Sequence, residues 1–226
     1  MRHINVDSLS EYCDFVETGQ EPLSEFTSQV TTNHTHFFRE KHHFDTLVEY
    51  LRTNGHENRK IWSSACSSGE EPYSIALAIR QSIPAAFKSS LKIIASDLDE
   101  RILEQAIRGV YAEKRIEVLT HGQRSLGFMR GRNEMSGTVK VKEWMRSMIE
   151  FRKINLMESL NFGGNVDVIF CRNVVIYFDH QSKLKLFSKF ADIQRSGDLL
   201  FIGHSESLNG ISSAYHCLGS TVYKRL

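Results

Sequence analysis

The stretch from residue 60 to residue 100 constrains the fold more than any other part of the chain. An apolar run that begins at residue 60 breaks into small residues and Gly69, and a helical pattern follows at once. A second apolar run begins at residue 91 and ends at Asp97. In a parallel sheet, the loop after the first strand and the acid that ends the second lie at the same carboxyl edge, where ligands bind. The Asp97 carboxylate could hold the hydroxyls of a ribose there, so the pattern predicts a nucleoside site.

Strand-like and helical runs alternate through the rest of the chain, which is typical of an α/β fold with a mostly parallel sheet. Strands are expected near residues 60–65, 92–96, 149–154, 166–171, 198–203, 214–217 and 221–225. The clearest helices are expected at residues 71–82, 100–108 and 180–194. We assign these seven strands and their helices to one domain at residues 55–226.

The segment before this domain has a helical pattern of its own. Residues 8–18 place apolar side chains on one face, and residues 35–53 are expected to form one or two further helices. These helices carry too few apolar side chains to form a core alone. We therefore interpret residues 1–54 as an N-terminal helical region and linker beside the sheet domain.

One segment, at about residues 127–151, breaks the alternation of strands and helices. A turn-rich stretch there precedes residues 138–142, where polar and apolar side chains alternate strictly, as in a half-exposed strand. The segment is expected to form a small antiparallel β insert. Residues 130–153 carry seven Lys or Arg side chains against three Glu, a net charge of +4. Two interpretations stay open: a solvated hairpin with incidental charge, or a docking face for an acidic protein.

Composition excludes several classes of protein. The chain has 226 residues, of which 41% are apolar, and this suffices for one sizeable α/β core. A net charge of +1 gives no chain-wide field toward nucleic acid or a membrane, and no apolar run approaches the ~18 residues that span a bilayer. Four cysteines without a Cys-x-x-Cys pair, and no secretory segment after Met1, favour a cytoplasmic protein with reduced thiols. The clustered histidines lack metal-ligand spacing, so no metal is expected.

The loop after the first strand narrows the choice of cofactor. A dinucleotide loop needs several glycines for close approach to a pyrophosphate, and here Gly69 stands alone. Glu70 and Glu71 follow it, and two carboxylates at a helix start would repel a pyrophosphate. S-adenosylmethionine carries a sulfonium and an amino group but no phosphate, so it matches better. The alternative is that the two glutamates only stabilise the helix start.

Six blocks of sequence carry a resemblance to a known family. They are TTNHTHFFRE (residues 31–40), SSGEEPYS (67–74), ASDLD (95–99), NL (155–156), FCRNVVIYF (170–178) and GHSE (203–206). In this order they closely resemble the chemotaxis receptor methyltransferases, the CheR family. The resemblance implies a class I S-adenosylmethionine-dependent methyltransferase, with a Rossmann-like, mostly parallel seven-stranded sheet and a helical region shorter than the family's usual one.

The resemblance also implies a reaction and a partner. The methyl group of S-adenosyl-L-methionine would be transferred to glutamate side chains in the cytoplasmic domain of methyl-accepting chemotaxis receptors. The products would be glutamyl methyl esters and S-adenosyl-L-homocysteine. The enzyme would act as a monomer, without nucleic acid and without insertion into the membrane.

Individual residues take their expected roles from the matching blocks. The resemblance implies Arg39 and Tyr177 at the reacting centre. It implies cofactor contacts from Asn33, Thr35 and Arg39 in the linker, Glu71 in the loop, Asp97 at the ribose, Asn155 and Leu156 at the adenine, and Asn173 and Val174 at a strand end.

Two other functions stay in view. The chain could be a regulatory module that binds the cofactor with altered or lost catalysis, which predicts binding without turnover. An NAD-dependent oxidoreductase is disfavoured by Glu70, Glu71 and the missing glycines.

Overall fold

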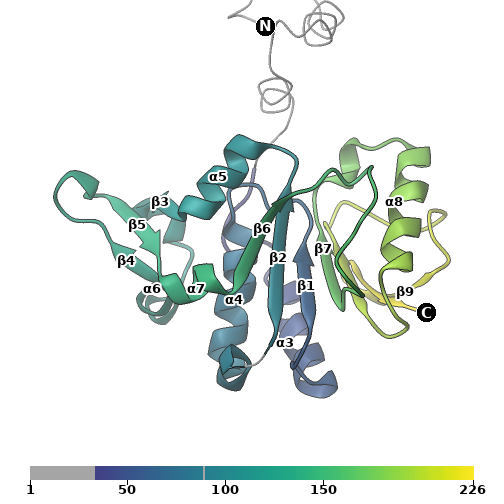
Figure 1. Ribbon diagram of the computed structural model, residues 1–226, viewed down its shortest axis with the longest axis horizontal. Coiled ribbons are helices and arrows are strands. Elements are labelled where there is room, and N and C mark those ends of the chain that lie inside the picture. The colour runs from purple at the N-terminus through teal and green to yellow at the C-terminus, as the bar shows by residue number, and fades with distance from the viewer. Residues whose placement is uncertain (1–33, 89) are drawn as a thin grey trace, which may run out of the picture.

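A sheet of seven strands forms the centre of the computed structural model, which describes residues 34–88 and 90–226 (Figure 1). The strand order is β6-β2-β1-β7-β8-β10-β9; the first five are parallel, and β10 pairs antiparallel with β8 and β9. The strands are β1 (Lys60–Ser63), β2 (Lys92–Asp97), β6 (Ile149–Lys153), β7 (Val168–Cys171), β8 (Leu199–Ile202), β9 (Tyr215–Gly219) and β10 (Val222–Arg225). The mostly parallel sheet predicted from the sequence is therefore confirmed, with all seven expected strands.

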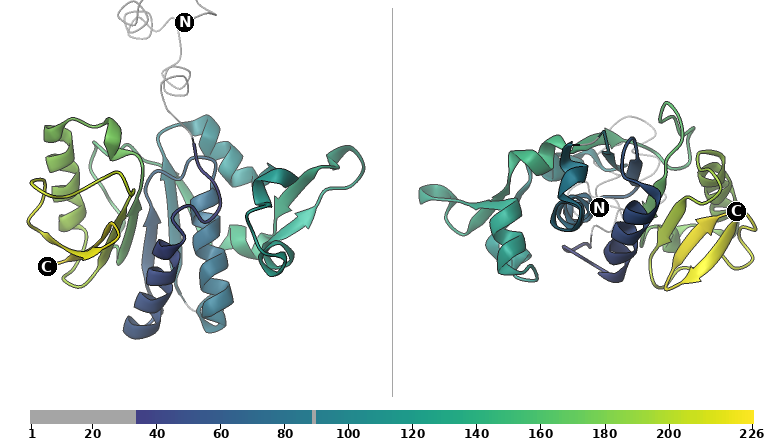
Figure 2. Two further views of the ribbon diagram at one scale, coloured as in Figure 1. Left: turned by 180° about the vertical axis from the view of Figure 1, so that it is seen from behind. Right: turned by 90° about the horizontal axis from the view of Figure 1, so that it is seen from below.

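Helices cover both faces of this sheet. The predicted helices are present as α4 (Glu70–Ser82), α5 (Glu100–Arg108) and α8 (His180–Asp192). As expected for strands covered on both sides, alternate side chains enter two separate cores: Ile61 packs with the core that includes α4, and Trp62 with the core that includes α8. Figure 2 shows α8 apart from α4, across the sheet.

A second, smaller sheet projects from the main one (Figure 1). Its strand order is β3-β5-β4, and both pairings are antiparallel. Its strands are β3 (Val110–Ala112), β4 (Phe128–Arg130) and β5 (Thr138–Val141). The sequence predicted the antiparallel insert from the alternation in β5 but not β3, which lies before the expected segment and has only three residues.

Short helices complete the fold. They are α6 (His121–Gly127), α7 (Glu143–Ser147) and the 3-10 turns η1 (Pro84–Lys88), η2 (Glu113–Ile116), η3 (Asn133–Met135) and η4 (Val175–Tyr177). Of the helices in the described ranges, none has the length and apolar character needed to cross a bilayer.

Within the described residues 34–59, the chain forms one helix, α3 (His42–Asn54), where the sequence predicted one or two over residues 35–53. A turn over residues 37–41, here called the linker turn, precedes it. Phe37 in this turn is fully buried and makes edge contacts with Tyr111 of β3 and Phe128 of β4, which tie the turn to the small sheet. The expected helix at residues 8–18 lies outside the described residues.

Candidate functional site

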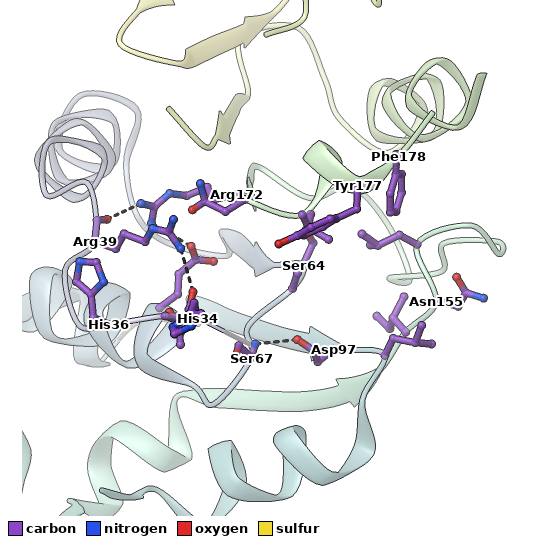
Figure 3. A pocket seen from close by; sticks show the side chains of 18 of the residues that line it. His34, His36, Arg39, Ser64, Ser67, Asp97, Asn155, Arg172, Tyr177 and Phe178 are labelled. Carbon is purple, nitrogen blue, oxygen red and sulfur yellow. Dashed lines mark hydrogen bonds and ion pairs between the residues drawn. The ribbon is translucent and has the colours of Figure 1, made fainter. Parts of the chain in front are cut away.

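A cavity of about 280 Å³ opens at the carboxyl ends of four neighbouring strands, β6, β2, β1 and β7 (Figure 3). Each strand contributes the residues that directly follow it, and the chain just before α3 closes the remaining side. The cavity is lined by His34, Thr35, His36, Arg39, Phe44, Ser64, Ala65, Ser67, Glu71, Asp97, Leu98, Ile154, Asn155, Leu156, Arg172, Asn173, Val174, Tyr177 and Phe178.

Asp97 ends β2 and presents its carboxylate at the base of this cavity. The side chain is held in place because Oδ2 accepts a hydrogen bond from the backbone N–H of Ser67 (2.7 Å) and Oδ1 accepts one from the N–H of Asp99 (3.1 Å). Asp97 is 8% exposed, and burial raises the pKa of its carboxyl. Each carboxylate oxygen can accept a second hydrogen bond, so Asp97 can still bind two neighbouring hydroxyls of a ligand.

The loop between β1 and α4 is fixed by its backbone. The N–H of Ser64 donates to the carbonyl of Phe170 in β7, and the N–H of Cys66 donates to the carbonyl of Ser96 in β2. Ser67 and Gly69 both have positive φ, 48° and 95°. A Cβ on Gly69 would lie 2.9 Å from the Cβ of Ala106, so this close turn requires glycine.

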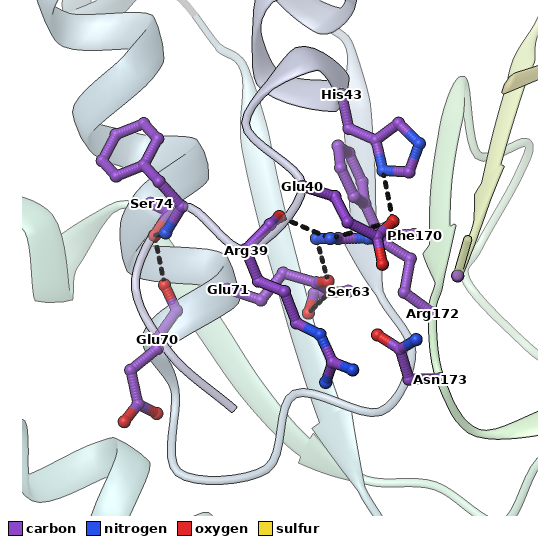
Figure 4. A network of polar contacts seen from close by, with 12 residues as sticks. Arg39, Glu40, His43, Ser63, Glu70, Glu71, Ser74, Phe170, Arg172 and Asn173 are labelled. Carbon is purple, nitrogen blue, oxygen red and sulfur yellow. Dashed lines mark hydrogen bonds and ion pairs between the residues drawn. The ribbon is translucent and has the colours of Figure 1, made fainter. Parts of the chain in front are cut away.

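Glu71 lies in the first turn of α4, and its carboxylate lines the cavity. It accepts hydrogen bonds from the hydroxyl of Ser63 (2.6 Å) and from Nη1 of Arg172 (3.0 Å) (Figure 4). Burial raises the pKa of the Glu71 carboxyl even though the Arg172 guanidinium opposes the shift. A positive group of a ligand would therefore be stabilised beside it.

Glu70, the neighbouring acid, does not line the cavity. Its side chain is fully buried; Oε1 pairs with Arg115, and Oε2 accepts a hydrogen bond from the hydroxyl of Ser68 (2.6 Å). Only one of the two glutamates used in the sequence argument against a pyrophosphate therefore faces the ligand space. Glu70 instead joins the loop to Arg115, outside the ligand space.

Arg39 and Tyr177 reach the cavity from two different segments. Arg39 belongs to the linker turn, and its Nη1 donates to the carbonyl of His34 (3.0 Å). Tyr177 ends η4 and is 62% exposed, at the mouth of the cavity. Figure 3 shows its hydroxyl directed toward the side from which Arg39 enters.

The structure brings together every predicted site residue that it describes. These are Thr35, Arg39, Glu71, Asp97, Asn155, Leu156, Asn173, Val174 and Tyr177, all of which line the one cavity. Asn33 lies outside the described residues.

Several lining residues did not emerge from the sequence. The main ones are Arg172, Ser67 and Phe178. Each belongs to one of the sequence blocks that carried the resemblance, so the blocks were the available signal, but nothing in the residue types distinguished these positions from their neighbours.

The side chains that line the cavity fit a nucleoside with a cationic tail better than a dinucleotide. Asp97 can accept from two hydroxyls, and Glu71 favours a positive group. Apolar side chains that can cover a base line the same cavity as Asp97: Leu98, Ile154, Leu156 and Phe178. Two carboxylates within one cavity would repel the charges of a pyrophosphate.

Comparisons with known proteins agree with this geometry. The family described as "CheR methyltransferase, SAM binding domain" matches residues 33–224. A chemotaxis protein methyltransferase 2 of Pseudomonas aeruginosa is 39% identical, with 99% of this chain and 80% of the relative covered. Chemotaxis protein methyltransferases of Salmonella typhimurium and Escherichia coli are 37% and 35% identical, each with 99% of this chain and 78% of the relative covered. The chain therefore belongs to the CheR methyltransferase family.

Proposed function

We propose that this protein transfers the methyl group of S-adenosylmethionine to glutamate side chains of chemotaxis receptors and forms methyl esters. The observation that carries the proposal is that Asp97 and Arg39 line one cavity. An acceptor for ribose hydroxyls and a cation for an incoming carboxylate thus share a single space. Relatives that are 35–39% identical and named chemotaxis protein methyltransferases support the same reaction.

The cofactor side of the cavity is provided by residues after β2, β6 and β7. We expect Asp97 to hold the ribose hydroxyls and Glu71 to face the amino group. Asn155, Leu156, Asn173 and Val174 would line the adenine and the remainder of the nucleoside, and Thr35 would contact it from the linker. When bound, S-adenosylmethionine supplies a methyl group activated by the positive sulfonium.

The acceptor side requires little chemistry from the protein. A glutamate carboxyl has a pKa of ~4.3 and is ionised at neutral pH, so the attacking oxygen needs no general base. It does need orientation and the removal of water. Arg39 can hold one carboxylate oxygen through its planar guanidinium, and the exposed Tyr177 can donate its hydroxyl at the mouth of the cavity.

The substrate class determines the expected partner and location. The partner would be the cytoplasmic domain of a methyl-accepting receptor, and the enzyme would accordingly act in the cytoplasm. We expect the enzyme to be a monomer. Neither nucleic acid nor membrane insertion is part of the proposal.

The direct test uses labelled S-adenosylmethionine and purified cytoplasmic fragments of receptors from the same organism. Alkali-labile methyl label on receptor glutamates is expected with the wild-type chain, and the rate of labelling is expected to fall by about 100-fold or more with the Arg39→Ala variant. Calorimetry with S-adenosylhomocysteine is run in parallel. Saturable binding without label on any receptor fragment would contradict the proposed reaction and favour a regulatory module.

A further inference from the structure

The backbone of the linker turn adopts an unusual conformation around Arg39. Phe38 and Glu40, on either side of it, both have φ of 54°, in the left-handed region that non-glycine residues rarely occupy. Such a backbone persists only when surrounding contacts hold it. The N–H of Phe38 donates to the hydroxyl of Ser74 in α4 (2.9 Å), which is one of these contacts.

Arg172, directly after β7, supplies the next contacts. Its guanidinium is 2% exposed, donates through Nη2 to the backbone carbonyl of Arg39, and donates through Nη1 to Glu71 (Figure 4). It also lies 5.8 Å from the ring centroid of Phe44 in α3. One side chain from the end of β7 therefore joins the linker turn to α4 and α3.

Glu40 completes the same connection. Its Oε2 lies 3.4 Å from Nη2 of Arg172, and its Oε1 accepts a hydrogen bond from the backbone N–H of His204 (3.3 Å). Burial by itself would raise the pKa of the Glu40 carboxyl, but Arg172 and the His204 amide outweigh burial and leave that pKa lowered. Glu40 is therefore an anion at neutral pH, and Arg172 bridges the two side chains of Glu40 and Glu71.

We infer that Arg172 is a positioning residue for Arg39. It binds the carbonyl of Arg39 itself, so it fixes the peptide from which the Arg39 guanidinium extends into the cavity. The guanidinium has its own hydrogen bond to His34, within the same chain segment. The orientation of Arg39 relative to the sheet thus depends on the contacts that hold the linker turn. Arg172 contacts the turn from the end of β7, and Glu40 connects the turn to His204 after β8. The expected effect of Arg172 on turnover rests on the proposed function. Its expected effect on the backbone of the linker turn does not.

The Arg172→Lys variant distinguishes the positioning role of Arg172 from the effect of its positive charge. Arg172→Lys keeps one positive charge but loses the planar fork that reaches Glu71 and the Arg39 carbonyl together. Glu40→Gln removes the negative charge of the Glu40 side chain with little change of its shape. Arg59→Lys is the matched control, because Arg59 also forms an arginine–carboxylate pair, with Asp167 (2.6 Å), at the opposite edge of the sheet.

Amide hydrogen exchange, measured by mass spectrometry on the full chain, tests the turn without any need for activity. In a peptide covering residues 37–41, exchange is expected to be about tenfold faster in Arg172→Lys and in Glu40→Gln than in the wild type. Arg59→Lys should leave this peptide unchanged. Equal exchange in the wild type and Arg172→Lys would overturn the inference, whatever the activity.

Kinetics test whether the contact acts through Arg39. Arg172→Lys is expected to lower kcat by about 10- to 100-fold in the wild-type background. In an Arg39→Ala background, the same change should lower kcat by less than about twofold, because the group being positioned is gone. Equal losses in both backgrounds would refute positioning through Arg39. A wild-type chain that transfers no methyl would refute the proposed function instead, and the exchange measurement would still decide the role of Arg172.

Discussion

The carboxylate of Asp97 is joined to the backbone N–H of Ser67 by a hydrogen bond of 2.7 Å. This bond connects the end of β2 to the loop after β1, so the acid at the base of the cavity also holds the loop that forms its wall. A second backbone donor, the N–H of Asp99, fixes the other oxygen. Replacing the carboxylate should therefore affect the ligand and the loop together.

Asp97→Asn keeps the size of the side chain but removes its charge and turns one acceptor into a donor. The new N–H donor must face either a backbone N–H, which is also a donor, or the ligand, so at least one hydrogen bond to the carboxylate is lost. A hydrogen bond to a charged group contributes about 1.5–3 kcal/mol to stability or binding. We expect binding of S-adenosylhomocysteine, measured by calorimetry, to weaken by about 10- to 100-fold. Glu150→Gln is the control, because that side chain is 54% exposed and does not line the cavity. An unchanged affinity in Asp97→Asn would exclude Asp97 as the ribose acid.

Arg39→Ala tests the acceptor side. The variant removes the guanidinium that we expect to hold the substrate carboxylate, whereas Asp97 and the apolar wall remain. Misplacement of a reacting group costs about 100-fold in rate, so kcat for receptor methylation should fall by at least that factor. The dissociation constant of S-adenosylhomocysteine should change by less than about tenfold. A large loss of affinity with kcat preserved would reverse the assignment and place Arg39 on the cofactor side.

Gly203, directly after β8, approaches the site too closely to carry a side chain. A Cβ there would lie 2.3 Å from Nδ2 of Asn173 and 2.8 Å from Oε2 of Glu206, both shorter than real contacts. Glu206 in turn accepts a hydrogen bond from the N–H of Asn173 (3.1 Å). Overpacking of this kind costs about 1–3 kcal/mol, so Gly203→Ala should lower the free energy of unfolding by that amount and weaken cofactor binding.

Gly122 provides the matched control for this substitution. It lies inside helix α6, and a Cβ added there would meet no atom closer than 4.0 Å. Gly122→Ala should therefore leave binding unchanged and, through better helix propensity, stabilise the protein by up to about 1 kcal/mol. Equal urea midpoints for Gly203→Ala and the wild type would show that the segment at Asn173 can move to accept the added methyl group without loss of stability.

The sequence predicted the sheet and the edge that carries the site because both depend on local patterns. Alternate strand residues face opposite sides, and residues that directly follow parallel strands meet at one edge. Asp97 and Glu71 could therefore be expected together in one cavity from the sequence. Both residues lie at a strand or helix end, and the path of the backbone brings them to this edge of the sheet.

The contacts of Arg172 could not be predicted in the same way. Its guanidinium contacts residues 101 and 133 positions away, and such contacts depend on side-chain rotamers and on the path of the linker turn. The different positions of the Glu70 and Glu71 side chains, one outside the cavity and one lining it, have a simpler cause. Successive helical residues point about 100° apart, so one acid faces the cavity while the other meets Arg115.

His43 is a buried histidine one turn beyond the reacting centre. It is 0% exposed, and its Nε2 lies 3.0 Å from the carbonyl of Ser220 and 3.1 Å from Oγ1 of Thr221. Burial, together with the positive charge of Arg172, lowers the pKa of His43 to about 4. The imidazole is thus neutral in the folded protein at pH 7 and donates from Nε2.

The lowered pKa of His43 predicts a loss of stability in mild acid. In the unfolded chain His43 takes up a proton near pH 6.5, whereas in the folded chain it does so only near pH 4. As pH falls between these values, the proton favours the unfolded state, and the loss reaches at most about 3 kcal/mol below pH 4. His43→Gln keeps a donor for Ser220 but cannot titrate. Urea unfolding from pH 7 to pH 4 should therefore show the wild type losing more stability than the variant, by up to that amount. Parallel curves for the two proteins would mean that the pKa of His43 is the same in the folded and the unfolded chain, so that its ion pair with Glu40, 3.5 Å away, offsets burial and Arg172.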